Sequence, residues 1–135
     1  LGHIMWEHVG MARTKEGLEE GLKLMKNLRK EFETNLFVPG SKDGLNVELD
    51  KAFRLNDFIT MGELIAWDAL NRNESCGGHF REEYQTEDGE AKRDDQNCFY
   101  VSCWEYQGSD DKAPVMYKEP LKYEAIEVKT RNYKN

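Results

Sequence analysis

The chain has 135 residues, 33% charged and 39% hydrophobic, a composition typical of a single globular domain over residues 1–135. The formal net charge of −7, without a basic stripe, argues against a nucleic-acid partner. No apolar run is long enough to span a bilayer, no signal peptide is visible, and three cysteines make no disulfide framework, so we expect no direct membrane insertion and a reducing cytosol.

The first predicted element is a short helix from Leu1 to Val9, with Ile4, Met5 and Val9 on its buried side and Trp6 packed beside them. The chain opens without an initiator Met and already lies inside this apolar pattern. Native amino termini are usually looser than this. We therefore expect a domain excised from a larger protein.

A longer helix is predicted after Thr14, whose side chain can cap the first turn. Apolar residues then recur at steps of three and four, which predicts a narrow buried stripe: Leu18, Leu22, Met25, Leu28, Phe32 and Leu36. The Pro- and Gly-containing segment 38–44 predicts a loop, because both residues break helices and strands.

The apolar run from Asn46 to Asn73 predicts the longest helix, with Asn46 as its N-cap. Between Phe58 and Leu70 apolar residues occur on nearly every side, so we expect other elements to surround this helix. The glycine pair at 77–78 is expected to end the helical pattern, because glycine adopts left-handed or extended backbone angles at little cost.

The predicted fold class is mainly α, with a small antiparallel β appendage at the C-terminal end. Short connections favour antiparallel neighbours, which predicts an up-down-up three-helix bundle (spectrin-repeat-like) over about residues 1–75. About residues 76–135 are expected to form a polar loop and a small β region. Short strands are predicted at 98–106, 115–117 and 124–128.

Cys76, His79, Cys98 and Cys103 are the candidate zinc ligands. Cys98 and Cys103 are separated by an odd number of residues, so on one strand they would point to opposite faces. Buried, inert thiols are the simpler interpretation. Ser75 or Cys76 beside His79 also lacks the strand–turn–helix context of an activated nucleophile. We predict no catalytic, cofactor-binding or metal-ligating residue.

The segment after the third predicted helix, residues 72–81, is the polar turn. It contains Arg72, Glu74, Ser75, Gly77, His79 and Arg81. This pattern resembles the Arg-x-Glu-Ser-Arg-Gly-Ala-His motif in the C-terminal helical domain of succinate dehydrogenase and fumarate reductase flavoprotein subunits, a family that includes aspartate oxidase as a relative. Further segments resemble that domain in the same order: Ile4-Met5, Val9-Gly10, Arg13-Thr14, Arg93-Asp94-Asp95 and Arg131-Asn132-Tyr133. Cys76 and Gly78 stand where the family commonly has Arg and Ala.

The resemblance implies a parent enzyme that interconverts fumarate and succinate with FAD and passes electrons to an iron–sulfur subunit, as in anaerobic respiration or the tricarboxylic acid cycle. The flavin-binding and substrate-closing parts would precede this region. The fragment alone is therefore implied to be non-catalytic and to hold no cofactor. Its implied partners are its own FAD-binding domain and the iron–sulfur subunit, in the cytoplasm at the inner face of the cell membrane through other subunits.

Two alternatives stay open at this point: the same domain from L-aspartate oxidase or another relative, and an autonomous helical protein-interaction module. If the chain comes from a fumarate reductase or succinate dehydrogenase flavoprotein, we expect the polar turn to contact the flavin domain. Some charged groups of the turn would then be partnerless and exposed in the isolated fragment. On that hypothesis, Arg72→Ala or Arg81→Ala would change the stability of the fragment by no more than about 0.5 kcal/mol.

Overall fold

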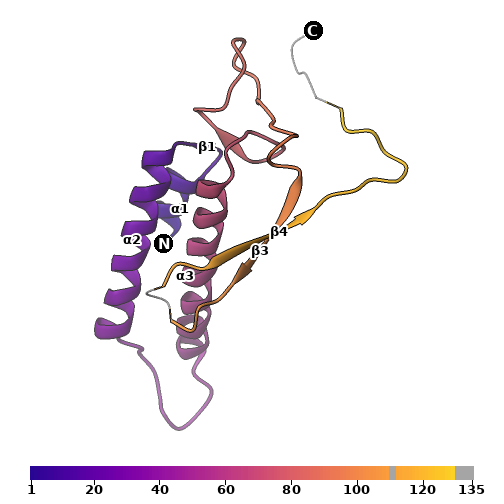
Figure 1. Ribbon diagram of the computed structural model, residues 1–135. Coiled ribbons are helices and arrows are strands. Elements are labelled where there is room, and N and C mark those ends of the chain that lie inside the picture. The colour runs from indigo at the N-terminus through magenta and orange to yellow at the C-terminus, as the bar shows by residue number, and fades with distance from the viewer. Residues whose placement is uncertain (110–111, 130–135) are drawn as a thin grey trace.

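The structure, a computed structural model, describes residues 1–109 and 112–129. Three helices dominate it: α1 (Gly2–Val9), α2 (Lys15–Asn35) and α3 (Val47–Asn71). They run up, down and up beside one another (Figure 1), so the predicted three-helix bundle and the mainly α class are confirmed. No helix in the described part of the chain is long and apolar enough to cross a membrane. The segment Arg131-Asn132-Tyr133 lies outside the described residues.

Local side-chain hydrogen bonds explain where the two long helices begin. Thr14 Oγ1 accepts a 3.0 Å hydrogen bond from the Gly17 N–H at the start of α2. Asn46 Oδ1 accepts hydrogen bonds from the N–H groups of Glu48 (3.0 Å) and Leu49 (3.2 Å) at the start of α3. These backbone donors have no acceptor within their helix, so each cap removes an unsatisfied group. Both predicted caps are confirmed.

The core lies where the three helices meet, and each helix contributes buried apolar side chains: Val9, Leu18, Met25, Ile59, Ala66 and Ala69. Trp6 is 80% exposed, so its predicted packing beside Ile4 and Met5 is wrong. Successive helical residues point about 100° apart, which turns Trp6 out of the buried side of α1. The predicted stripe on α2 also ends early, because Leu36 follows the helix and is exposed.

Two helical glycines allow close approach between helices. A Cβ built at Gly21 would lie 2.9 Å from His8 Cβ on α1. A Cβ built at Gly62 would lie 3.1 Å from Met5 Sδ and 3.2 Å from Met25 Sδ. These separations are shorter than ordinary van der Waals contacts, so the missing side chains set how closely α1 packs on its neighbours.

Gly21→Leu is expected to lower the free energy of unfolding by about 1–3 kcal/mol, because α1 would have to shift to make room. Urea unfolding followed by circular dichroism measures this loss. Gly44→Leu is the matched control, since nothing lies within 4 Å of a Cβ built there. Its expected effect is below about 0.5 kcal/mol. Equal losses in the two variants would contradict the close packing of α1.

α3 ends at Asn71, earlier than predicted and before the glycine pair at 77–78. Arg72 is already extended, with φ −94° and ψ 101°. The guanidinium of Arg81 donates a 2.9 Å hydrogen bond to the carbonyl oxygen of Ala69 in the last helical turn. The prediction that the glycines end the helix is therefore wrong, because a side chain from further along the chain satisfies its terminal carbonyls.

One face of α3 is uncovered. Phe58, Met61 and Ile65 are spaced three and four residues apart, so they share a helix face, and they are 59%, 52% and 44% exposed. We call these three residues the α3 apolar face. The prediction of a helix surrounded on every side is wrong, because α1 and α2 pack against a different side of α3.

A short parallel strand pair joins the bundle to the polar turn. β1 (Ala12–Arg13) follows α1, and β2 (Phe80–Arg81) ends the turn. Ala12 pairs with Phe80 and Arg13 with Arg81. The sequence did not predict this pair, since two residues are too few to show a strand pattern.

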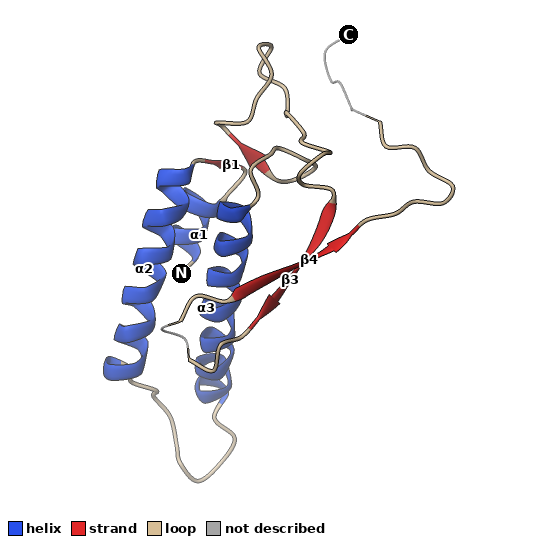
Figure 2. Ribbon diagram, viewed as in Figure 1, coloured by secondary structure: helices blue, strands red, loops and turns tan. Residues whose placement is uncertain are grey.

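β3 (Tyr100–Glu105) and β4 (Val115–Pro120) form an antiparallel hairpin that crosses in front of α3 in the view of Figure 2. This hairpin confirms the small antiparallel β appendage. The predicted strand at 124–128 is wrong. That segment pairs with no strand in the described part of the chain, so its backbone has no ladder partners.

Candidate functional site

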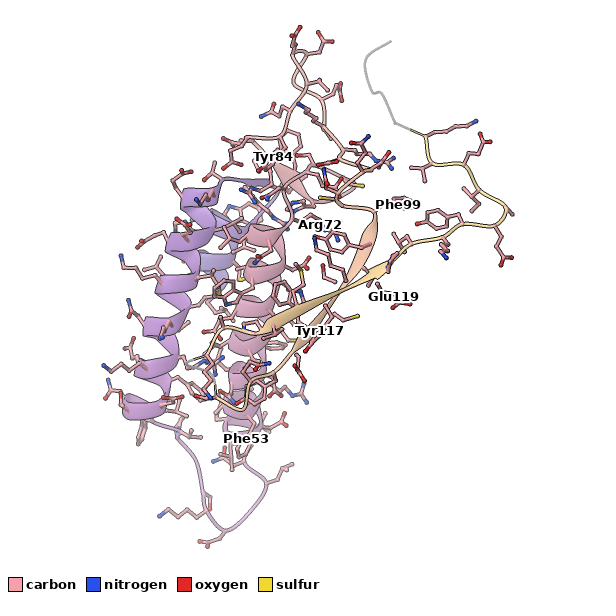
Figure 3. All side chains as sticks on the ribbon, viewed as in Figure 1. Phe53, Arg72, Tyr84, Phe99, Tyr117 and Glu119 are labelled. Carbon is pink, nitrogen blue, oxygen red and sulfur yellow. The ribbon has the colours of Figure 1, made fainter. Side chains whose placement is uncertain are left out.

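Arg72 links the end of α3 to the start of the hairpin. Its Nη1 donates to Glu74 Oε1 (2.9 Å) and to the carbonyl oxygen of Cys98 (3.0 Å). Its Nη2 donates to the carbonyl oxygen of Tyr100 (3.0 Å), and the guanidinium lies 4.8 Å from the centre of the Tyr100 ring. Figure 3 shows Arg72 between α3 and β3. The side chain therefore fixes the hairpin to the bundle.

Glu74 links the polar turn to the loop that precedes the hairpin. Its side chain is buried, and Oε2 accepts a 3.0 Å hydrogen bond from the Asp94 N–H. The neighbouring Ser75 N–H donates to the carbonyl oxygen of Lys92 (2.9 Å). In the same loop Arg93 forms an ion pair with Asp95. Two segments that resemble the family at distant positions therefore meet in space.

Arg81 is the most deeply buried charged side chain of the turn, at 2% exposed. Besides Ala69, it donates to the carbonyl oxygen of Leu70 (3.3 Å), and its Nε pairs with Glu83 Oε2 (3.0 Å). Its backbone N–H donates to Ser75 Oγ (2.8 Å), which in turn donates to the Arg81 carbonyl oxygen (3.1 Å). The side chain of Arg81 thus caps the C-terminal end of α3, and its backbone joins the two sides of the turn through Ser75.

His79 lies among arginines. Arg13 Nη1 is 2.8 Å from His79 Nδ1, and His79 Nε2 is 3.0 Å from the carbonyl oxygen of Arg72. An arginine can only donate, so we assign Nδ1 as the acceptor and Nε2 as the protonated nitrogen of a neutral imidazole. Burial, followed by the charges of Arg13, Arg81 and Arg72, holds the pKa of His79 below its ordinary value, against the raising effect of the hydrogen bond to the Arg72 carbonyl.

The stability of the chain is expected to rise with pH between the lowered pKa of folded His79 and its ordinary pKa of 6.5. In this window the unfolded chain binds the proton more readily, so acid favours unfolding, and above it the full contribution is present. Urea midpoints at a series of pH values test this, with non-titrating His79→Gln as the control. A wild-type slope equal to that of His79→Gln would show that the neutral-imidazole assignment is wrong.

The tip of the polar turn faces solvent. Cys76, Gly77 and Gly78 are exposed, and Gly77 adopts a left-handed φ of 59° that favours glycine. The Cys76 N–H donates to the His79 carbonyl oxygen (2.8 Å), and the His79 N–H donates back (3.0 Å). The tip is therefore a fixed, tight reversal of the backbone.

The expectation of partnerless, exposed charged groups in the turn is wrong. The buried side chains of the turn are hydrogen-bonded within the chain: Glu74, Ser75 and Arg81. Both terminal nitrogens of Arg72 also donate hydrogen bonds, to the carbonyl oxygens of Cys98 and Tyr100. In the described residues, no buried side-chain nitrogen or oxygen lacks a hydrogen-bond partner. Partners outside the turn, at residues 69–70, 83 and 92–100, supply many of these bonds, and sequence spacing cannot show such contacts. Arg13 is a member that the site prediction missed, although it stood in a segment that resembled the family.

The cysteines differ in burial. Cys98 is buried, and this burial, together with the charges of Glu74 and Asp94, raises the pKa of its thiol. Cys76 and Cys103 are exposed, so the prediction of buried thiols is right for Cys98 alone. Cys76 stands at the solvent-facing tip, and Cys103 stands on the outward side of β3. Across residues 1–109 and 112–129, no three His, Cys, Asp or Glu side chains are placed to hold a metal ion.

Taken with its partners, the polar turn is a clamp. It ties the corner after α1, the end of α3, the loop at 92–95 and the start of β3 into one hydrogen-bonded unit. Its cations are already paired with carboxylates, carbonyls or His79. The arrangement therefore holds these four segments in fixed positions relative to one another.

Comparison with known proteins identifies the family. A family model described as "Fumarate reductase flavoprotein C-term" matches residues 1–133. The chain belongs to this family. The match confirms the resemblance found in the polar turn, and it excludes an accidental likeness.

Individual members of the family and its relatives agree with this assignment. The fumarate reductase flavoprotein subunit of Helicobacter pylori is 29% identical over 128 residues, covering 95% of this chain and 17% of that protein. The chloroplastic L-aspartate oxidase 2-b of Nicotiana tabacum is 33% identical over 85 residues, covering 62% of this chain and 13% of that protein. The chain therefore spans about a sixth or less of the curated relatives it matches.

A solved structure shows the same fold. The flavoprotein chain of E. coli quinol fumarate reductase superimposes with a TM-score of 0.76 at 22% identity, covering 93% of this chain and 20% of that one. The bundle and its β appendage are thus the architecture of this region in the fumarate reductase flavoprotein.

Proposed function

We propose that this chain acts as the C-terminal helical domain of an FAD-dependent enzyme that interconverts fumarate and succinate. Its role is to pack against the FAD-binding domain and to support contacts with an iron–sulfur subunit. The flavin and the residues that bind substrate and move protons belong to the preceding parts of that enzyme. The site of action is the cytoplasmic face of the membrane, which the chain reaches through other subunits.

The α3 apolar face is the observation that carries this proposal. Large apolar side chains clustered on one helix face usually mark an interaction surface. Here Phe58, Met61 and Ile65 remain about half exposed in a chain that spans 17% of its Helicobacter pylori relative. In a protein of that length, another domain would pack against this face and remove it from water.

The polar turn has a second part in the proposal. Its charged groups hold the tip from Cys76 to Gly78 in one conformation, and the tip is exposed. We assign this tip as a contact to the flavin domain, positioned by Arg72, Glu74, Ser75, Gly77, His79 and Arg81. On this account the departure from the family motif at Cys76 changes the contact surface without changing the fold.

The test is to purify the whole flavoprotein that contains this chain and to assay it with alternative substrates. We expect a yellow protein with bound flavin that oxidises succinate with an artificial acceptor and reduces fumarate with a reduced viologen dye. A flavin-free protein, or a flavoprotein inert to both acids, would overturn the proposal.

L-aspartate oxidase is the competing function, because a relative with that name is 33% identical to this chain over 85 residues. The same purified protein separates the two. Reduction of the flavin by aspartate and not by succinate would assign the chain to the aspartate oxidase branch. The expected result is reduction by succinate alone.

A further inference from the structure

A pocket outside the polar turn lies between the helices and the hairpin. Its volume is about 310 Å³, and residues of α2, α3, β3 and the segment that leads into β4 line it. Small-molecule sites in proteins begin at about this size and are lined mainly by apolar and aromatic side chains. The size and the position of this pocket therefore fit one small ligand.

Aromatic rings from two different elements stand in the pocket wall. Trp67 belongs to α3, Trp104 belongs to β3, and Tyr106 directly follows β3. Apolar side chains from α2, α3 and the segment before β4 complete the lining: Leu22, Leu64 and Pro114. The Nε1 of Trp104 already donates to Asp68 Oδ1 at 2.9 Å, so the carbon atoms of this ring are what a ligand would contact.

The lysines in the wall supply carbon rather than charge. Lys23, Lys26 and Lys112 line the pocket, yet all three are exposed. A lysine in such a place keeps its ammonium group in water while its aliphatic stem covers apolar surface. Lys23 is also paired with Glu20, and Lys26 interacts with another group of the chain. The three lysines therefore do not make the pocket a site for an anion.

The carboxylate in the described part of the wall is also satisfied. Glu63 Oε2 accepts a 2.7 Å hydrogen bond from Arg29 Nη2, and the same nitrogen donates to Thr60 Oγ1 at 3.0 Å. A charged ligand would exchange its water for a wall whose charged groups are paired or hydrated, and that exchange is unfavourable. An uncharged ligand meets no such cost.

We propose that this pocket binds an uncharged aromatic molecule of one or two fused rings. Rings of this size suit the volume, and aromatic rings favour stacked or edge-to-face contact with one another. The assignment is independent of the flavoprotein function, because the pocket shares no lining residue with the polar turn and needs no flavin.

The tryptophans make the proposal testable by NMR on the 135-residue chain. Trp67 and Trp104 line the pocket, whereas Trp6 on α1 is 80% exposed and lies outside it. The probe is 2-naphthol, which is uncharged at neutral pH. It should shift the indole N–H signals of Trp67 and Trp104 saturably and leave that of Trp6 in place.

Two comparison compounds test the chemistry of the ligand. Decahydro-2-naphthol has the same carbon skeleton and hydroxyl group without aromatic rings, and 2-naphthoate carries a negative charge. Both should bind more weakly than 2-naphthol, the first because it lacks aromatic contacts and the second because its charge must lose water.

A matched pair of variants tests the location. Ala113 lines the pocket and is exposed, so a larger side chain there fills space without entering the core. Ala113→Phe should remove the saturable shifts. Ala125→Phe makes the same change at an exposed alanine outside the pocket and should leave them unchanged. The spectrum without ligand shows that each variant still folds.

Trp67→Leu tests the aromatic wall while keeping it apolar. The variant should weaken 2-naphthol binding about two- to tenfold, the range of one aromatic contact, without changing the affinity for decahydro-2-naphthol. The indole N–H signal of Trp104 reports both affinities.

Four results would overturn the proposal. Equal shifts of all three indole signals, or none that saturate, would mean that the pocket is not a ligand site. Unchanged binding to Ala113→Phe would place the ligand elsewhere. Equal affinities for 2-naphthol and its saturated analogue would show that the site does not select aromatic rings. Tighter binding of 2-naphthoate would show that it selects charge.

Discussion

Arg81→Ala is expected to lower the free energy of unfolding of this chain by about 2–4 kcal/mol. Arg81 is 2% exposed, and its guanidinium donates to carbonyl oxygens at the end of α3 while it pairs with Glu83. Alanine would leave the carbonyls of Ala69 and Leu70 without this donor and would open a cavity beside them. Urea unfolding followed by circular dichroism measures the loss.

Arg54→Ala is the matched control for this prediction. Arg54 lies on α3 and, like Arg81, has an acidic partner, Asp50, but its side chain is 67% exposed. Its removal should change stability by less than about 0.5 kcal/mol. If Arg81→Ala lowered the free energy of unfolding as little as Arg54→Ala, the bonds of Arg81 to the end of α3 would not stabilise the polar turn.

Arg29→Met is expected to cost about 2–4 kcal/mol. Arg29 is 6% exposed between α2 and α3, and its Nη2 donates to Glu63 Oε2 at 2.7 Å. The variant leaves the carboxylate of Glu63, 19% exposed, beside an apolar side chain without its ion-pair partner. Removing one member of a buried pair is costly chiefly because of the charge that stays behind.

The double variant Arg29→Met/Glu63→Leu separates this cost from simple loss of packing. With both charges gone, stability should return to within about 1 kcal/mol of the unmodified chain. Urea midpoints of the single and double variants give the coupling between the two sites. A double variant that loses the sum of both single effects would mean that the ion pair is not the source of the cost.

The sequence predicted those parts of the fold that depend on local patterns. Steps of three and four between apolar residues placed α2, and Thr14 and Asn46 marked the starts of α2 and α3 because a cap acts within three residues of itself. Arg29 was missed, yet it continues the four-three spacing of Leu18, Leu22 and Met25. A charged residue at a core position was the signal that an interhelix ion pair existed.

Parts of the structure that depend on distant contacts could not be predicted. The motif located the polar turn, but which groups are buried depends on Arg13, Lys92 and Asp94, each far from the turn in sequence or across a loop. The apolar run of α3 likewise showed that many of its sides avoid water. It could not show that one of these sides stays about half exposed in the described part of the chain.

Methionine oxidation tests the central claim, that the α3 apolar face is covered by the rest of the flavoprotein, most directly. Met61 is 52% exposed in this chain, and Met25 is 0% exposed and gives the rate of a protected methionine. Mild peroxide treatment followed by mass spectrometry measures both rates in this chain and in the whole flavoprotein. The account predicts that Met61 reacts much faster than Met25 in this chain and about as slowly as Met25 in the whole protein. Equally fast oxidation of Met61 in both would contradict it.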